Sequence, residues 1–534
     1  MKNILNQRFV LLIAPWLLLS PWGQAETFLT TTRKIADLNP GNSGSFPSNF
    51  TTLGDALYFS AHTAETGREL WSFDGTSITL AANINDAVVS MAGNSSFPTG
   101  FVAYRDKLYF SAFDQRRGGE LWSFNGTNAV RITDINPDSN DTIKSNPNSS
   151  WPSELTVFND ALYFSAASGN NESNYELWNY NGTNATIVMN INTGNNASSF
   201  PRDLTPFENA LYFMADDGVH GYELWKHTGS QTLLTDINPG GATSGSFPKM
   251  FFEFNGVLYF QAFHSSSGFE LWKTDGIAVS IAADINPGVG SSNPDFPIVY
   301  KGSLYFRADD GTHGSELWKT DGTNFTMVAD LNAGGSSFPK NFTVFNDQLL
   351  FSATDGANGW ELWKYDGTTA TLVTNLNSSS DAFPESLTIL NDRLYFTATT
   401  SETGYELWFY DGTAVKLAAD LWPNSGDAFP HNLKTFNGQL VFSAQQVAND
   451  YEMWAVTLAP FRIESLQVAS NQAQLFWRTL GGTTNILQAS ENVTGPYTNL
   501  SVPIIISGTA ATTTNYIDAE NPTAATRFYR VAQP

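Results

Sequence analysis

Hydrophobic residues in this chain form short continuous runs separated by polar turns, and their spacing is not helical. A run such as "ALYF" follows a segment like "FPKNFTVFN" and precedes segments that contain "ELW" and then "ATLVTNLN". Unbroken apolar runs are typical of strands covered on both faces. Asn-Gly, Asn-Asp or Asp-Gly joins the first segment to the second and the third to the fourth, and these pairs accept the positive φ of hairpin turns. The pattern predicts units of four antiparallel strands.

This unit recurs with a period near 46 residues, which is typical of β-repeats. Nine tryptophans occupy one equivalent position, in Glu-Leu-Trp or Glu-Met-Trp: Trp71, Trp122, Trp178, Trp225, Trp272, Trp318, Trp363, Trp408 and Trp454. A residue that every unit shares is best explained by what every unit must do. We therefore predict a structural role for these tryptophans, packed between neighbouring units, with the motif glutamate bonded to backbone amides.

Four-stranded sheets stacked around an axis form a β-propeller, and the two ends of the repeat region complement each other. "TTTRKIADLN" is a fourth strand with no Glu-Leu-Trp before it, whereas the last unit stops at "YEMWAVTLAP". The N-terminal strand is expected to complete the ninth blade and close the ring, which removes exposed sheet edges. The sequence thus predicts an all-β propeller of about nine blades, with an open or two-ring arrangement as the alternative.

The repeats leave a segment at each end. In residues 1–25, Lys2 and Arg8 precede an apolar run, and Gly23 and Ala25 are the small residues that a signal peptidase needs, so we expect a signal peptide. Residues 26–458 form the predicted propeller. Residues 459–534 carry short alternating strands without the motif, which predicts a small fibronectin-like β-sandwich. We expect a secreted or cell-surface protein, with the periplasm as an alternative.

The composition of the chain limits the classes of partner that we expect it to bind. A net charge of -24 argues against nucleic acid and anionic membranes. No later segment has the 18 or so apolar residues of a membrane span. The absence of cysteine excludes disulfides and thiolate metal sites. Carbohydrate, cations or a protein at the cell surface remain as expected partners.

One copy of the motif carries a family resemblance. "ELWKTDGT" (Glu316 to Thr323), with "ADDGTHG" before it and "ADLN" after it, resembles the bacterial ELWxxDGT-repeat proteins. The resemblance covers roughly residues 33–458. It implies a secreted or surface protein with β-propeller-like repeats and no established activity.

Candidate chemistry is expected on the face with the longer loops. Asp216, Asp217, Asp309 and Asp310 lie beside glycine and offer hard oxygen ligands, so they are calcium candidates, with a solvated turn as the alternative. His220 and His313 share one repeat position and are binding candidates, although loop packing is the simpler interpretation. The sequence indicates no other cofactor.

Three tryptophans outside the repeated position complete the binding candidates: Trp151, Trp360 and Trp422 lie in or beside loops, where they could stack on a sugar ring. No nucleophile elbow, zinc-protease motif or phosphate-binding loop occurs. We therefore expect an exported non-enzymatic binding or surface scaffold protein that presents a variable propeller face, and we assign no catalytic residue. The alternatives are a carbohydrate-active enzyme, a glycosidase or lyase with carboxylates at the axis, and a structural surface or matrix component.

Overall fold

The computed structural model describes residues 30–458 apart from 42, 87–93, 138–146, 170–172 and 231, together with the strands between residues 461 and 532. Every regular element of these residues is a β-strand. None of them belongs to a helix able to cross a membrane. The predicted signal peptide, residues 1–25, and much of the two longest crossovers between blades lie outside the described residues.

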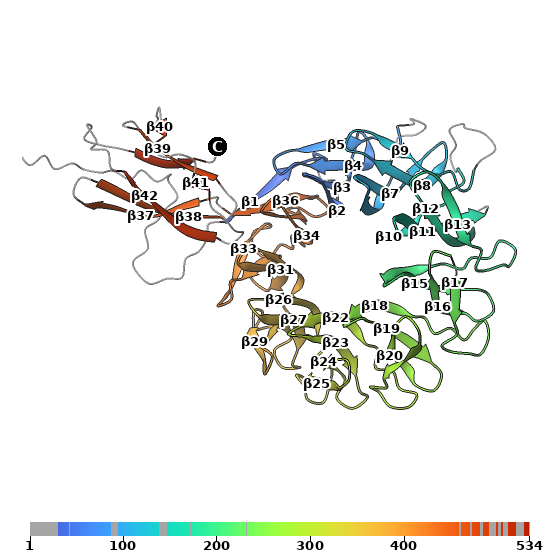
Figure 1. Cartoon of the computed structure of the whole chain (residues 1–534). Coiled ribbons are helices and arrows are strands. Elements are labelled where there is room, and N and C mark those ends of the chain that lie inside the picture. The colour runs from blue at the N-terminus through green and yellow to red at the C-terminus, as the bar shows by residue number, and fades with distance from the viewer. Residues whose placement is uncertain are drawn as a thin grey trace, which may run out of the picture. The chain divides into compact units, whose positions relative to one another are not determined.

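Nine four-stranded sheets in residues 30–458 form the blades of a β-propeller (Figure 1). Blades one to three contain β2 (Ser48–Leu53), β3 (Ala56–Thr63), β4 (Gly67–Phe73), β5 (Ile78–Ala82); β6 (Thr99–Tyr104), β7 (Lys107–Asp114), β8 (Gly118–Phe124), β9 (Ala129–Arg131); and β10 (Ser153–Phe158), β11 (Ala161–Gly169), β12 (Ser173–Tyr180), β13 (Ala185–Met189). Blades four to six contain β14 (Arg202–Phe207), β15 (Ala210–Asp216), β16 (Tyr222–His227), β17 (Thr232–Thr235); β18 (Lys249–Phe254), β19 (Val257–His264), β20 (Gly268–Thr274), β21 (Val279–Ala283); and β22 (Asp295–Tyr300), β23 (Ser303–Asp309), β24 (Ser315–Thr320), β25 (Phe325–Ala329). Blades seven to nine contain β26 (Lys340–Phe345), β27 (Gln348–Thr354), β28 (Trp360–Tyr365), β29 (Ala370–Thr374); β30 (Glu385–Leu390), β31 (Arg393–Thr400), β32 (Gly404–Tyr410), β33 (Val415–Ala419); and β34 (His431–Phe436), β35 (Gln439–Gln445), β36 (Tyr451–Leu458) with β1 (Thr30–Ala36).

The chain closes the ring with its N-terminal strand. Eight blades are simple meanders such as β2-β3-β4-β5, whereas the ninth has the order β1-β36-β35-β34. First strands of neighbouring blades lie side by side near the axis, and β2 also lies beside β34 of the last blade. The predicted closed propeller of nine blades is confirmed, and the open arrangement is not found.

Apolar clusters between neighbouring blades form the core. In one of them, Tyr163 and Leu177 of blade three pack against Phe213 and Trp225 of blade four. Trp225 is 5% exposed. The other motif tryptophans are buried or half-buried, and seven of them lie in or against clusters of the same kind: Trp71, Trp122, Trp178, Trp272, Trp318, Trp363 and Trp408. Burying each one contributes about 2–3 kcal/mol.

The motif glutamates are completely buried and connect consecutive blades. Glu223 accepts hydrogen bonds from the N–H of Ile237 (2.9 Å), at the end of its own blade, and from the N–H of Ser246 (2.9 Å), which leads into the next blade. The Ser246 hydroxyl donates to the same carboxylate. Burial raises the pKa of Glu223, and these hydrogen bonds oppose the shift. The predicted pairing of this glutamate with backbone amides is thus present.

The C-terminal strands form two small antiparallel sheets. The first contains β37 (Phe461–Ala469), β38 (Gln472–Leu480) and β42 (Ala511–Asp518). The second contains β39 (Thr484–Ser490), β40 (Thr498–Asn499), β41 (Ile504–Ile505) and β43 (Phe528–Ala532). A small β-sandwich requires two such sheets. The fibronectin-like character of this C-terminal region remains a prediction.

Candidate functional site

A short segment ending in proline precedes the first strand of every blade. Its middle residue is aromatic in eight blades and Asn293 in the sixth. We call the eight aromatic side chains the aromatic rim: Phe46, Phe97, Trp151, Phe200, Phe247, Phe338, Phe383 and Phe429. Because first strands lie nearest the axis, the topology distributes the rim around the axis on one face, which also carries the loops between second and third strands.

The phenylalanines of the rim are open to solvent although they are large and apolar. All seven are between 37 and 54% exposed, and Phe97 is the most exposed. Single exposed apolar residues are common on protein surfaces, but a repeated set on one face is a feature of interaction sites. The rim is therefore the first candidate for a binding surface.

The backbone of the rim is unusual and firmly held. All nine middle residues, Asn293 included, have φ between 42° and 49°. This left-handed conformation costs about 1–2 kcal/mol for a residue with a Cβ atom, and asparagine tolerates it better than phenylalanine. In blade five, the N–H groups of Ser246 and Phe247 both donate to the carbonyl oxygen of Tyr222, at 2.9 and 3.0 Å. Hydrogen bonds from the preceding blade thus impose the conformation.

Neighbouring aromatic side chains stack on residues of the rim. Phe200 stacks on Tyr175 with ring centroids 5.4 Å apart, and Phe429 stacks on Tyr405 at the same separation. Both tyrosines come directly before the motif glutamate of the preceding blade. One face of each of these two rim side chains is therefore packed, and the rest remains available to a ligand.

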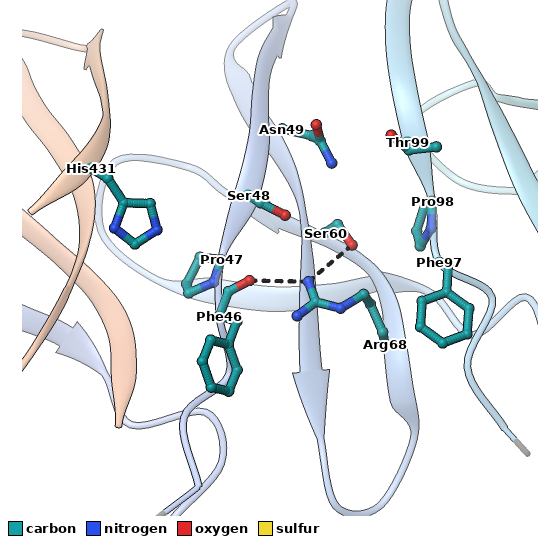
Figure 2. Close-up of a pocket in the computed structure, with 10 residues that line it drawn as sticks. All are labelled: Phe46, Pro47, Ser48, Asn49, Ser60, Arg68, Phe97, Pro98, Thr99 and His431. Carbon is teal, nitrogen blue, oxygen red and sulfur yellow. Dashed lines mark hydrogen bonds between the residues drawn. The ribbon is translucent and has the colours of Figure 1, made fainter. Parts of the chain in front are cut away.

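A cavity of about 380 Å³ lies between two consecutive rim residues, Phe46 and Phe97 (Figure 2). Arg68 lines it, and its Nη1 donates to the carbonyl oxygen of Phe46 (3.0 Å) and to Ser60 Oγ (3.4 Å). A guanidinium has five N–H donors, so it can also bind an acceptor that enters the cavity. Burial lowers the pKa of Arg68, but arginine remains charged at any physiological pH. This cavity combines aromatic walls with one cation.

Two carboxylates of the first strands form bonds to the next or the preceding blade. Glu154 Oε2 accepts the N–H of Asp203 in the next blade at 2.9 Å. Lys340 Nζ donates to Glu385 Oε1 at 2.9 Å, again across a blade boundary. These groups hold neighbouring first strands together, which is a different arrangement from the acid and base pair expected for a glycosidase.

Two of the three predicted binding tryptophans belong to the aromatic surface. Trp151 is itself a rim residue and stacks on Phe113, with centroids 5.9 Å apart. Trp360 lies between Phe338 and Phe383, at 6.0 and 6.3 Å. Trp422 is not in the rim: it is a half-buried crossover residue whose backbone N–H donates to Glu406 Oε1 (3.0 Å). Stacking on a ligand therefore remains a prediction for all three tryptophans.

The predicted aspartate and histidine sites form two separate copies of one turn, in blades four and six. Asp217 Oδ1 accepts the N–H groups of Val219 and His220, and its Oδ2 is 2.7 Å from His220 Nδ1. Asp310 and His313 repeat this arrangement at the same distance. The hydrogen bond to Asp217 raises the pKa of His220.

The first aspartate of each pair also serves its own turn. Asp216 Oδ1 accepts the N–H of Gly218, and Asp309 Oδ1 accepts the N–H of Gly311, both at 2.7 Å. In each turn, one oxygen of the first aspartate and both oxygens of the second are therefore engaged in turn hydrogen bonds, and calcium binding at these four aspartates remains an untested prediction.

Sequence reasoning missed the rim itself. The Phe-Pro segments were interpreted only as the start of a strand. Phe-Pro recurs in seven blades, but the positive φ that turns the aromatic residue outward comes from hydrogen bonds to the preceding blade. Such a long-range cause leaves no local signal in the sequence.

No protein-family model and no curated protein sequence matches the chain. Solved structures do match. The β-propeller domain of the Trilobed protease from Pyrococcus furiosus is 12% identical, with 62% of this chain and 98% of that chain covered and a TM-score of 0.32. A puromycin hydrolase is 14% identical over 74% of this chain and 58% of its own, with a TM-score of 0.35. A prolyl endopeptidase is 11% identical over 61% of this chain and 54% of its own, with a TM-score of 0.36.

These comparisons correct the expectation of an exported non-enzymatic binding or scaffold protein, because the proteins that the chain resembles are peptidases or a domain of one. The physical reason for the error is that one propeller scaffold serves free-standing proteins and enzyme domains equally, so repeats and missing motifs could not separate them. The chain spans little more than half the length of the puromycin hydrolase and the prolyl endopeptidase. At these identities the likeness concerns the fold, and the activities belong to those proteins.

Proposed function

We propose that this propeller is the substrate-selecting part of a peptidase and that it gathers extended peptide segments on the aromatic rim. The observation that carries the proposal is the exposure of seven phenylalanines, each in a left-handed conformation, on one face of the ring.

Backbone geometry alone does not account for the aromatic residues. Asn293 adopts the same φ in blade six, so a residue with a lower conformational penalty fits the position. Packing accounts for one face of the side chains that stack on a neighbouring ring, as Phe200 does on Tyr175. Exposed phenylalanine adds no solubility and no hydrogen bond. A ligand with apolar side chains gives a reason to keep it.

An extended peptide suits this surface better than a sugar. Phenylalanine has no polar group with which to orient a ring of hydroxyls, whereas it packs well against apolar peptide side chains. Arg68, beside Phe46 and Phe97, can bind a peptide carbonyl or a terminal carboxylate. The repetition of the rim offers several apolar contacts to side chains spaced along one chain.

Catalysis is not assigned to a residue. In the described part of the propeller, no histidine joins both a hydroxyl group and a carboxylate. The proposal therefore concerns the capture and selection of the substrate.

The test combines binding and hydrolysis on one sample. Fluorescent peptides rich in phenylalanine, leucine and proline are titrated with the protein by anisotropy, and mass spectrometry follows the appearance of shorter products. Phe97→Ser removes about 100 Å² of apolar contact, worth about 2 kcal/mol, so peptide affinity should fall at least about tenfold.

Ile277→Ser is the matched control. Ile277 is 95% exposed but lies in a turn between third and fourth strands, on the opposite face of the ring. The variant Ile277→Ser removes more exposed apolar surface than Phe97→Ser does, yet it should leave the peptide affinity unchanged. Equal losses in the two variants, or no peptide binding by the unaltered protein, would show that the rim does not select peptides.

A further inference from the structure

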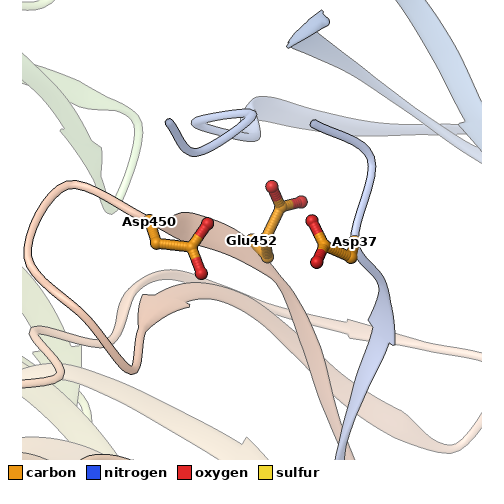
Figure 3. A group of neighbouring side chains, drawn as sticks. All are labelled: Asp37, Asp450 and Glu452. Atoms are coloured by element: carbon orange, nitrogen blue, oxygen red, sulfur yellow. The ribbon is translucent and has the colours of Figure 1, made fainter. Parts of the chain in front are cut away.

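The seam that closes the ring brings three carboxylates together. Asp37 follows β1, and Asp450 and Glu452 lie on either side of Tyr451 where β36 begins (Figure 3). Each of the three offers one oxygen, and these oxygens lie within 4.8 Å of one another. Among the described residues this is the group of three acidic side chains close enough to share an ion.

Two members of the group are ordinary parts of a blade. Glu452 accepts the N–H of Leu38 (3.1 Å) and the N–H of Ser45 (2.9 Å), as the motif glutamates of other blades do. Asp37 begins the segment between blades, like Asp236 in blade four. Neither residue alone distinguishes the seam.

Asp450 is the exception. Two residues before the motif glutamate, seven other blades carry glycine and one carries asparagine: Gly67, Gly118, Asn174, Gly221, Gly268, Gly314, Gly359 and Gly404. Only the blade that contains the closing strand carries a carboxylate at this position.

The Asp450 carboxylate is buried with part of its hydrogen-bonding capacity unused. The residue is 7% exposed, and its Oδ1 has no hydrogen-bond partner. The other oxygen, Oδ2, is 3.5 Å from Lys34 Nζ. One ammonium group cannot balance three carboxylates, and a buried oxygen without a partner is destabilising.

We propose that Asp37, Asp450 and Glu452 bind a divalent cation, Ca²⁺, that links β1 to β36 and stabilises the closed ring. The three ligands are hard carboxylate oxygens, and Ca²⁺ accepts six to eight oxygen ligands in flexible geometry, so water can complete the shell through exposed Asp37. Lys34, whose side chain is 25% exposed, can turn to solvent when the ion enters. This site is separate from the aspartate turns of blades four and six.

The experiment measures Ca²⁺ binding and seam stability on the full chain. Calorimetric titration with CaCl₂ gives the affinity, thermal unfolding is compared in CaCl₂ and in EDTA, and hydrogen exchange reports on the amides of β1. Ca²⁺ should raise the unfolding temperature and slow exchange in β1. Asp450→Asn removes one charged ligand and should weaken Ca²⁺ binding at least about tenfold.

Asp236→Asn is the matched control, because blade four has the equivalent aspartate and glutamate but Gly221 in place of Asp450. This variant should respond to Ca²⁺ like the unaltered protein. If Asp450→Asn fails to fold, Asp37→Asn provides the same test, because Asp37 is exposed. The proposal is overturned if the unaltered protein does not bind Ca²⁺, or if Asp236→Asn loses the response as fully as the seam variants do.

Discussion

The hydrogen bonds of the buried motif glutamates predict the effect of replacing Ala428 with serine. In six blades the motif glutamate also accepts a hydrogen bond from a serine hydroxyl, as Glu270 does from Ser292 (2.5 Å). Ala428 stands in the equivalent position to this serine opposite Glu406. Burial raises the pKa of Glu406 to about 8. The variant Ala428→Ser restores the hydroxyl, so it should lower this pKa.

The direction of the stability change follows from the pKa. Glu406 has a folded pKa of about 8 against an ordinary value of 4.5. Its contribution to stability is therefore complete below pH 4.5 and is lost as the pH rises through 8. A hydroxyl bonded to the carboxylate is worth about 1.5–3 kcal/mol, against about 1 kcal/mol for the neutral acid. Ala428→Ser should thus stabilise the protein by about 1 kcal/mol more at pH 9 than at pH 5.

Thermal unfolding, followed by tryptophan fluorescence at pH 5 and pH 9, measures this difference. About 1 kcal/mol corresponds to about 1 °C in a propeller of this size. Ser292→Ala is the reverse variant, and its loss of stability should likewise be greater at pH 9. An equal gain from Ala428→Ser at the two pH values, or a loss at both, would refute the argument that the hydroxyl acts on the ionised carboxylate.

Three further predictions concern packing, backbone and charge. Trp225→Ala should lower stability by about 3–5 kcal/mol in thermal unfolding and leave the rim's peptide affinity unchanged, because Trp225 is buried between blades. Gly268→Ala should destabilise more than Gly256→Ala in the same assay, since both glycines have positive φ but only at Gly268 would a Cβ overlap another backbone, at Gly290. Asp217→Asn should lower the pKa of His220 in an NMR titration, because the hydrogen bond from this carboxylate raises it.

The sequence predicted the architecture because the signals for a blade are local. A tight turn is encoded by adjacent residues: Asp74 Oδ1 accepts the N–H groups of Thr76 and Ser77, and Gly75 has a φ of 98°. The buried second strand appears as an unbroken apolar run. The missing fourth strand of the ninth blade was visible because each end of the repeat region lacks what the other has. Repetition of these signals made the ring predictable.

The candidate sites were less predictable because they depend on contacts between distant segments. Whether Phe97 is buried or exposed depends on hydrogen bonds from its segment to Arg68 in the preceding blade. The importance of Asp450 depends on its approach to Asp37, more than 400 residues earlier in the chain. His220 illustrates the opposite case, since its partner Asp217 is three residues away and the turn that joins them is local.

The buried network and the exposed rim are adjacent parts of one short segment. The hydroxyl and N–H of Ser246 bind Glu223 in the core, and the next residue, Phe247, is exposed on the rim. The position of Phe247 is therefore fixed before a ligand arrives, so binding requires little further loss of conformational entropy. A loop could present the same side chain, but it would have to become ordered on binding. Attachment of the rim to the most buried polar group of each blade explains how a surface of phenylalanines can be both exposed and rigid.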